Sequence, residues 1–411
     1  MTQPTNDQIH RGIEGVIQSL QDLQKLYEAP VEPPRAENSF DTWEEAVEYY
    51  NLPRGLDYIY WDDDGPNDVW QQHKRIGKDA VLVLRERDEP YILNSSKGFP
   101  AAGVGWIDGP NGTQTPIVHD PNRWFEMSRG NVLGLGPRVV IEVGESEWTA
   151  PAQPYPMSYY DRNGVKQKVL EGNQNVLIRT HSKFGIFANF TIRGRSLGDV
   201  CYTALSGSGN EIYYVYDIVA DKANRGGAAI PNLETAVIGY YGGTDKNKIY
   251  TYEINNVLIN NFNGRSSSPI MINRSSGGVI RNVEMINEPT YGMPTYWRSW
   301  GDHQVYNSTI KSPKAGFNFE GNENFNFKCH FSHIEVGDGG YHFNIDPYGG
   351  SIGIETWGLT YSPNGYTPNT VVYHTYHASK PKMAATQRDI DIVGDNPKAL
   401  IPKERWLLTN L

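Results

Sequence analysis

Apolar residues near the start of the chain follow a heptad spacing, which predicts an amphipathic helix over residues 8–28. Their steps alternate between four and three positions, and they are Ile9, Ile13, Val16, Leu20, Leu23 and Tyr27. So short a helix is marginal on its own in water, so it either packs on its own domain or self-associates. The proline-rich segment 29–38 reads as a linker and favours self-association. The wide apolar stripe favours a coiled coil of three helices over one of two.

Beyond residue 185 the spacing of apolar residues changes to a short repeat that is typical of β-strands. Each copy has an apolar residue, any residue, Asn or Asp, two further residues and another apolar residue. The copies cover residues 187–192, 215–220, 254–259, 280–285 and 305–310. They lie about 25 residues apart, which is too short for a propeller blade. One longer step contains an inserted turn at residues 242–247.

This repeat predicts an all-β fold of the parallel β-helix type. Short strands separated by Gly, Asn and Ser turns would stack in register, so that each rung hydrogen-bonds to the next. The recurring Asn suits a corner position, because stacked amides can hydrogen-bond along a ladder. An irregular β-sandwich with chance spacing is the alternative.

The patterns divide the chain into four regions. They are a helical stem for trimerisation or attachment at 1–30, a linker and capping region at 31–79, the parallel β-helix at 80–360 and a C-terminal cap at 361–411. We expect a helix at 42–50 within the capping region, because the exposed end of a stack of strands needs covering.

Composition and charge narrow the possible functions. The 411 residues carry 37 Lys and Arg against 47 Asp and Glu, a net charge of −10, whereas nucleic-acid binding needs clustered basic residues. No apolar run is long enough to span a membrane, and no signal peptide is visible. Cys201 and Cys329 are too few for a disulfide scaffold or a zinc site, and we expect two buried thiols. The sequence therefore predicts no nucleic-acid partner, no membrane span, no metal and no cofactor.

Two stretches after the stem carry a family resemblance. Residues 77–84 read GKDAVLVL, and residues 125–137, which open the turns of the repeat, read FEMSRGNVLGLGP. With the heptad stem they resemble the tail spikes and minor tail proteins of bacteriophages, which have a pectate-lyase-like, single-stranded, right-handed parallel β-helix. The resemblance implies a homotrimer on the virion, assembled in the host cytoplasm and joined to other tail proteins through the stem. It also implies host-surface binding or polysaccharide cleavage.

The richest candidate chemistry lies in residues 288–303, which we expect to form a loop that leaves the surface of the β-helix. Aromatic rings stack on sugar rings, and the candidates for glycan binding are Tyr291, Tyr296, Trp297 and Trp300. Polysaccharide cleavage would need carboxylates or a base, and the weaker catalytic candidates are Glu288, Asp302 and His303. The sequence shows no calcium-binding carboxylate cluster with a nearby arginine base, which argues against a lyase mechanism.

Histidines later in the chain do not predict a metal site. His330 and His333 lie three positions apart, and such positions point to opposite faces of a strand. The leading hypothesis is a virion tail component, a receptor-binding protein that recognises a host cell-surface polysaccharide. One alternative is a polysaccharide depolymerase, a glycoside hydrolase or lyase that uses surface carboxylates. A second alternative is a purely structural tail protein.

Overall fold

A computed structural model of the chain describes most of its central region. The described residues are 38–77, 79–93, 104–108, 114–118, 125–143, 158–160, 166–168, 175–194, 203–221, 225–226, 235–260, 263–264, 267–286, 295–312, 315–320, 323–336, 341–346, 352–357, 360–361, 371–373 and 390–394. The predicted helical stem and its six heptad residues lie outside these residues, as does Cys201.

The described residues contain two helices, both in the predicted capping region. Helix α2 covers Trp43–Tyr49, and the side chain of its N-cap residue Thr42 accepts a hydrogen bond from the Glu45 amide. Helix α3 covers Val69–Ile76, and its N-cap Asp68 accepts from two backbone amides of the first turn. Such caps satisfy amides that have no partner within the helix. The helix predicted at 42–50 is confirmed.

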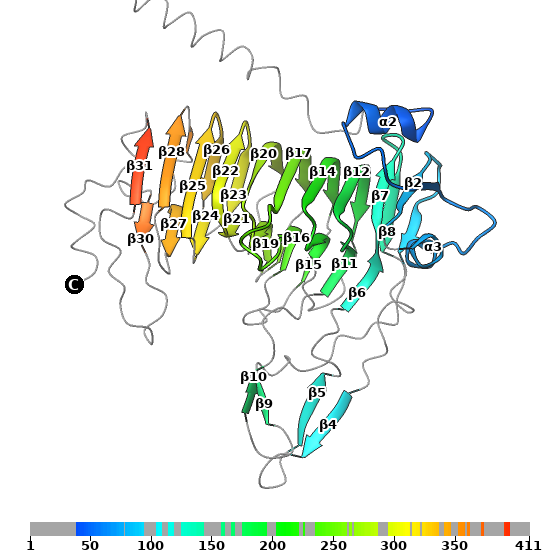
Figure 1. Cartoon of the computed structure of the whole chain (residues 1–411), viewed down its shortest axis with the longest axis horizontal. Helices are drawn as coiled ribbons and strands as arrows, with labels where there is room; N and C mark the ends of the chain where they lie inside the picture. Colours follow the sequence, from blue (N-terminus) through cyan, green and yellow to red (C-terminus); the bar gives the residue numbers. More distant parts are fainter. Residues whose placement is uncertain are drawn as a thin grey trace, which may run out of the picture. The chain divides into compact units, whose positions relative to one another are not determined.

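Three parallel sheets make up the rest of the main body (Figure 1). The long sheet has the order β1 (Tyr58–Tyr60), β2 (Val81–Leu84), β7 (Asn131–Gly134), β12 (Phe184–Arg193), β14 (Ile212–Asp221), β17 (Thr251–Asn260), β20 (Gly277–Ile286), β22 (Trp300–Tyr306), β25 (Glu323–His330), β28 (Ile352–Trp357) and β31 (Ile390–Gly394). Beside it, β8 (Val140–Val143) pairs with β12 and with β3 (Tyr91–Leu93).

The second sheet faces the long one across the core. Its order is β30 (Val371–Tyr373), β27 (Tyr341–Asp346), β24 (Ala315–Glu320), β21 (Thr295–Arg298), β19 (Ser267–Asn273), β16 (Thr235–Tyr241), β13 (Thr203–Ser208), β11 (Asn175–Thr180) and β6 (Phe125–Arg129). The third sheet has the order β23 (Thr309–Ser312), β26 (His333–Val336) and β29 (Thr360–Tyr361).

Three further strand pairs are short. Strands β15 (Arg225–Gly226) and β18 (Asn263–Gly264) form a parallel pair. The antiparallel pairs are β4 (Val104–Asp108) with β5 (Gln114–Val118), and β9 (Ser158–Tyr160) with β10 (Lys166–Lys168).

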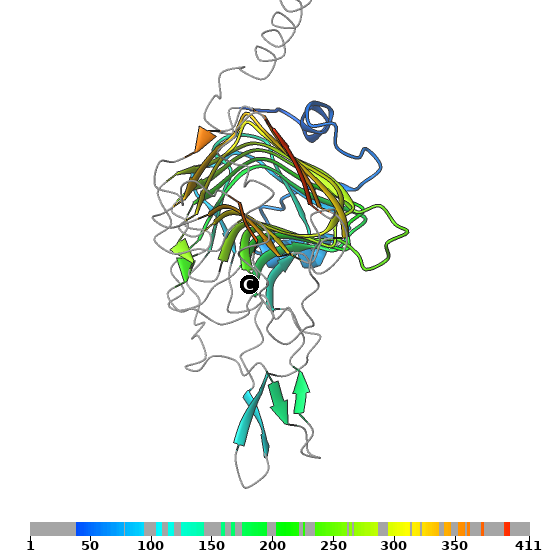
Figure 2. The same ribbon diagram turned by 90° about the vertical axis from the view of Figure 1, so that its left-hand side faces the viewer.

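From β11 onward, consecutive described strands belong to different sheets. In the two longer sheets each of these strands pairs in parallel with the next strand that returns to its sheet. Strand β12 is followed by β13 in the second sheet and then by β14, which pairs with β12. The same alternation continues through β17, β19, β20, β21 and β22. Figure 2, which looks along the stack, shows the strands of each sheet lying over one another. The prediction of an all-β fold with parallel pairing is confirmed.

The Asn or Asp of the sequence repeat takes a left-handed backbone conformation in every copy. These residues form what we call the left-handed row: Asn189, Asp217, Asn256, Asn282 and Asn307, with φ between 44° and 58°. Few residues other than glycine adopt this conformation, and Asn and Asp are enriched among them. The predicted amide ladder is present in part, because Asn307 Nδ2 donates to Asn282 Oδ1 at 2.9 Å. The row continues at Phe331, with a φ of 50°.

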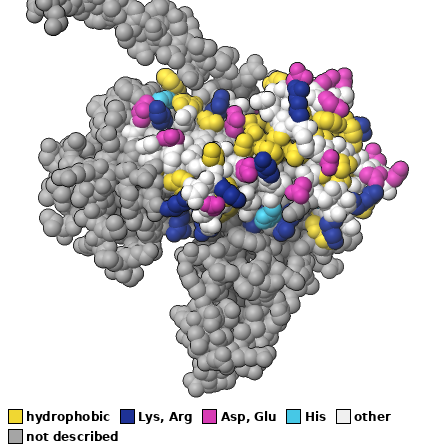
Figure 3. All heavy atoms as spheres, viewed as in Figure 1, with side chains coloured by type: hydrophobic (Ala, Val, Ile, Leu, Met, Phe, Trp, Pro, Cys, Tyr) yellow, Lys and Arg dark blue, Asp and Glu magenta, His cyan; other side chains and the backbone are white. Residues whose placement is uncertain are grey.

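Helix α2 and its flanking residues cover the outer face of the first strands of the long sheet. The buried residues of this contact are Ala46, Val47, Tyr50, Leu52, Tyr58, Val81, Val83, Leu133, Leu135, Ile186, Ala188 and Tyr216. Figure 3 shows hydrophobic side chains gathered over this part of the sheet, with charged side chains of both signs around them and over the later strands. The outward-facing residues of the long sheet change from buried on β12 to partly exposed on β17.

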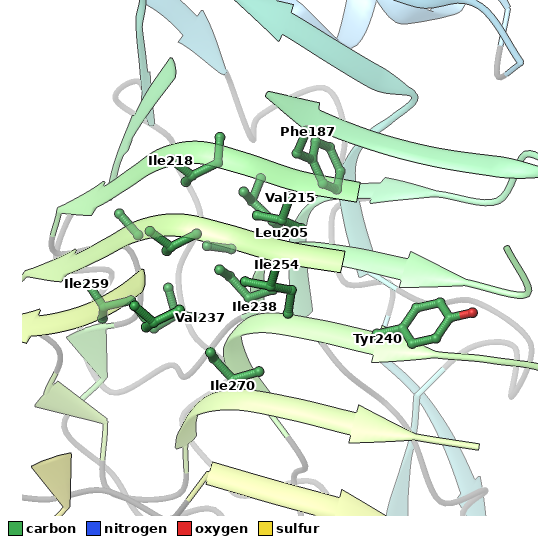
Figure 4. Packing of buried hydrophobic residues seen from close by; sticks show 14 of the residues in the cluster. Phe187, Leu205, Val215, Ile218, Val237, Ile238, Tyr240, Ile254, Ile259 and Ile270 are labelled. Carbon is green, nitrogen blue, oxygen red and sulfur yellow. The ribbon is translucent and has the colours of Figure 1, made fainter. Parts of the chain in front are cut away.

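The core lies between the sheets and is built from side chains that stack strand on strand (Figure 4). One row of the long sheet runs through Phe187, Val215, Ile254, Ile280, Val305 and Cys329, all fully buried. Burying one such side chain contributes about 1.5–3 kcal/mol. Cys329 is fully buried, as expected, and its burial raises the pKa of the thiol to about 12.

Strand pairing extends beyond both ends of the region expected for the β-helix. Strand β1 lies before residue 80 and pairs with β2. Strands β30 and β31 lie after residue 360 and pair with β27 and β28. Among the described residues, no Asn or Asp of the left-handed row lies on β1, β30 or β31.

Candidate binding site on the outer face of the long sheet

A hollow opens on the outer face of the long sheet where the cover of helix α2 ends. It has a volume of about 350 Å³ and is lined by Ile212, Tyr214, Thr251, Tyr252, Glu253, Gly278, Val279, Asp302 and Gln304. These residues come from β14, β17, β20 and β22, which are neighbours in the sheet. Because side chains alternate along a strand, Thr251 and Glu253 face outward while Tyr252 and Ile254 are buried.

A glycine sets the floor of this hollow. Gly278 pairs with Tyr252 across the sheet. A Cβ atom at Gly278 would come within 2.6 Å of the Tyr252 ring. Since real side chains do not approach so closely, the close contact depends on glycine at this position.

The two carboxylates of the hollow already have partners on neighbouring strands. Glu253 Oε1 lies 3.5 Å from Arg281 Nη2, and Asp302 Oδ1 accepts a hydrogen bond from Asn326 Nδ2 at 2.9 Å. Gln304 Oε1 accepts from the Tyr306 hydroxyl at 2.8 Å. The hollow thus combines hydrogen-bond acceptors and amide donors that neighbouring side chains hold in place.

Tyrosines close the hollow on the side of helix α2. The ring of Tyr216 lies 5.7 Å from that of Tyr214 and stacks on Tyr50 at 5.6 Å. Burial, followed by the charge of Glu253 and a hydrogen bond to it, raises the pKa of Tyr216. Tyr214 remains partly exposed and presents an aromatic surface next to Glu253.

Trp297 and His303 do not lie on the surface, so the expectation of an exposed aromatic loop is wrong for this part of the chain. Residues 295–298 and 300–306 form strands β21 and β22. Trp297 and His303 are fully buried, and Tyr296 is 7% exposed. The sequence predicts a loop here because the aromatic and polar residues of this segment hide the alternation of apolar and polar positions that is typical of a strand.

A buried hydrogen-bond chain explains the positions of Trp297 and His303. Trp297 Nε1 donates to the Tyr252 hydroxyl at 3.1 Å. His303 Nε2 lies 2.9 Å from the Trp300 carbonyl, and its Nδ1 lies 2.9 Å from the Tyr252 hydroxyl. A carbonyl only accepts, so Nε2 carries the proton and Nδ1 accepts from Tyr252. Burial lowers the pKa of His303 to about 4, so His303 is a neutral structural residue with no access to a ligand.

The other predicted site residues differ in their exposure and in their distance from the hollow, and two of them are not among the described residues. Asp302 is exposed and lines the hollow. Trp300 is partly exposed, and Lys246 Nζ lies 5.8 Å from the centre of its ring. Glu288 and Tyr291 lie outside the described residues. Of the seven candidates, the structure therefore brings Asp302 alone into the hollow within the described part of the chain.

The histidines that might suggest a metal belong to different sheets. His330 lies in β25 of the long sheet and His333 in β26 of the third sheet. His330 Nε2 is 3.2 Å from Glu355 Oε1. The described residues contain no group of three or more His, Cys, Asp or Glu side chains that could hold a metal ion. They also include no helix long and apolar enough to cross a membrane.

Comparisons with family models, with curated proteins and with solved structures found no match to this chain. The function of the candidate site therefore rests on the geometry of its residues. That geometry offers an open, shallow surface with acceptors, donors and an aromatic ring, which are the groups that bind sugar hydroxyls and sugar faces.

Proposed function

We propose that this protein is a glycan-binding virion tail component whose sheets form a right-handed parallel β-helix. The alternation of consecutive strands between stacked parallel sheets supports the β-helix, and right-handed crossovers are the rule for parallel strands. The heptad stem supports a homotrimer, and the bacteriophage resemblance supports a place on the tail, assembled in the host cytoplasm. The ligand is a host cell-surface polysaccharide.

The hollow on the long sheet is the observation that carries the glycan proposal. Carboxylates such as Glu253 and Asp302 accept hydrogen bonds from pairs of sugar hydroxyls, and the Gln304 amide donates to them. The ring of Tyr214 gives the apolar face of a sugar a surface to stack on. The open shape suits a segment of a long polymer, which can enter from the side.

The carboxylates fit binding better than cleavage. Glu253 and Asp302 are two strands apart, and their positions along the strands differ by two residues. At about 4.8 Å between strands and about 3.3 Å per residue, their Cα atoms lie roughly 12 Å apart. Glycosidase carboxylates lie about 5–9.5 Å apart. Both carboxylates point outward in parallel, so we expect the two carboxyl groups to be about as far apart as their Cα atoms.

Binding to host envelope polysaccharide tests the proposal. We expect Glu253→Gln and Tyr214→Ala each to weaken binding by about tenfold, because each removes a contact worth about 1–1.5 kcal/mol. Glu335→Gln is the matched control, since Glu335 forms a surface ion pair with Lys311 on the third sheet, away from the hollow. No binding by the wild-type protein would leave the purely structural alternative.

The same incubation separates binding from cleavage. New reducing ends or unsaturated uronates, lost in Asp302→Asn, would establish the depolymerase instead. The trimer has its own test, in which native mass spectrometry should give three chains for the wild type and one for Leu20→Asp. A wild-type monomer at micromolar concentration would contradict the trimer.

A further inference from the structure

A group of partly exposed aromatic side chains lies next to the hollow, and the proposed glycan site does not use it. It consists of Tyr306 on β22, His330 at the end of β25 and Phe331 directly after it. The rings of Tyr306 and His330 are 5.4 Å apart, and those of His330 and Phe331 are 6.3 Å apart. Phe331 is 37% exposed, so its apolar ring is open to a ligand.

Phe331 occupies a position where the rest of the chain has Asn or Asp. The other five members of the left-handed row are Asn or Asp, and Phe331 alone is large and apolar, with a φ of 50°. Left-handed backbone is unfavourable for bulky residues, and such outliers cluster at functional sites. Folding alone would be served better by Asn, so the aromatic ring at this corner calls for a role on the surface.

The aromatic group and the hollow form one continuous surface. Gln304 lines the hollow, and Tyr306 is the next outward-facing residue on the same strand. The Tyr306 hydroxyl donates to Gln304 Oε1 at 2.8 Å. Tyr306 in turn pairs with His330 across the sheet. A ligand that leaves the hollow past Gln304 therefore meets Tyr306 and then Phe331.

Polar groups flank this aromatic surface. Glu355 lies 3.2 Å from His330 Nε2 and 3.3 Å from Lys328 Nζ, on the strand beyond β25. An aromatic ring beside hydrogen-bonding groups is the combination that a pyranose needs, because its faces are apolar and its rim carries hydroxyls.

We propose that Phe331, with Tyr306 and His330, forms a second sugar-stacking subsite, so that the ligand is an oligosaccharide segment extending from the hollow to this corner. The inference rests on the proposed glycan binding and adds that chain length determines affinity. A short fragment occupies the hollow alone. A longer fragment also places a pyranose ring on Phe331.

The test compares the affinities of long and short oligosaccharides for one variant, Phe331→Asn. Asn tolerates the left-handed backbone at this position. The probes are hexasaccharides of glucose, mannose, galactose, rhamnose and N-acetylglucosamine, together with the disaccharide of whichever sugar binds. We expect Phe331→Asn to lose at least tenfold in affinity for the hexasaccharide and to bind the disaccharide as the wild type does. Phe331→Tyr should keep both affinities. Ile249→Asn, which removes another exposed apolar side chain, is the control and should also keep both.

The outcomes distinguish this inference from the proposed function. If the wild type binds no probe and no host polysaccharide, the proposed function fails. If the wild type binds and Phe331→Asn keeps its affinity for the hexasaccharide, the second subsite alone is wrong. Thermal unfolding gives an independent check, because we expect Phe331→Asn to unfold at the same or a higher temperature. A lower unfolding temperature would make Phe331 a structural residue and overturn the inference.

Discussion

Asn256 on β17 donates a hydrogen bond of 2.5 Å from its side-chain amide to the carboxylate of Asp217 on β14. The other oxygen of Asp217 accepts from the hydroxyl of Tyr50 and, at 2.7 Å, from the amide of Asn38. Asp217 thus receives three donors, two of them from the segment that covers the first strands. This explains why the left-handed row has an acid at this position. The side-chain NH2 group of an asparagine would face one of these three donors and could not accept its hydrogen bond.

Asp217→Asn should loosen the covering segment. We expect the free energy of unfolding to fall by about 1–3 kcal/mol, because one buried donor loses its acceptor. Hydrogen exchange should become faster in helix α2 and stay unchanged in strands β22 and β25. Glu211→Gln is the control, since Glu211 forms an exposed ion pair with Lys183 and should change stability by less than about 1 kcal/mol. Unchanged exchange in α2 would contradict the anchoring role of Asp217.

Two buried histidines should make the protein sensitive to acid. Burial lowers the pKa of His73 and of His303 to about 4, from an ordinary value of 6.5. The folded state holds both imidazoles neutral. Their contribution to the free energy of unfolding is therefore fully present above about pH 6.5 and is lost as the pH falls towards 4. Each shift corresponds to roughly 3 kcal/mol.

Urea unfolding at pH 7.5 and pH 4.5 measures this acid sensitivity. His303 stacks between the rings of Tyr252 and Phe325. In the variant His303→Phe, a phenyl ring takes this place, and a phenyl ring cannot bind a proton. We expect the variant to lose less stability between the two pH values than the wild type, by roughly 3 kcal/mol. An equal loss in both proteins would rule out a neutral buried His303.

Trp297 and Trp300 should behave differently although they are neighbours in the sequence. Trp297 packs against the rings of Phe317, Phe319 and Phe327 at 5.1–5.8 Å, so Trp297→Ala should cost about 3–5 kcal/mol of stability. Trp300→Ala, at a partly exposed position, should cost less than about 1 kcal/mol. Chemical denaturation of both variants gives the comparison, and equal losses would contradict the burial of Trp297.

Gly278→Ala should destabilise the strand beneath the hollow. The added Cβ would approach the ring and the carbonyl oxygen of Tyr252 to 2.6 Å, which forces a shift that typically costs about 1–3 kcal/mol. Gly55→Ala is the matched control, because no atom lies within 4 Å of a Cβ at Gly55. Urea unfolding of both variants tests this, and equal stability would show that the sheet accommodates the methyl group.

The candidate site was predicted less well than the fold, and Tyr214, Glu253 and Gln304 show why. Each is an ordinary polar or aromatic residue at an alternating strand position, and no local motif marks it. Their proximity depends on the register between β14, β17 and β22, to which a longer connection at residues 242–250 contributes. The alternation within β17 indicates that Thr251 and Glu253 face outward, but it does not indicate which residues lie beside them.

By itself the sequence determined the parallel all-β class, the capping helix and the positions of the five left-handed corners that have Asn or Asp. These features depend on local preferences, since Asn and Asp tolerate a positive φ and Thr, as at Thr42, is a favoured N-cap residue. Tertiary structure alone decided that Trp297 and His303 are buried and that Glu253 and Asp302 share a hollow. Inward or outward orientation depends on a strand's register with its neighbours, and a shift by one residue reverses it.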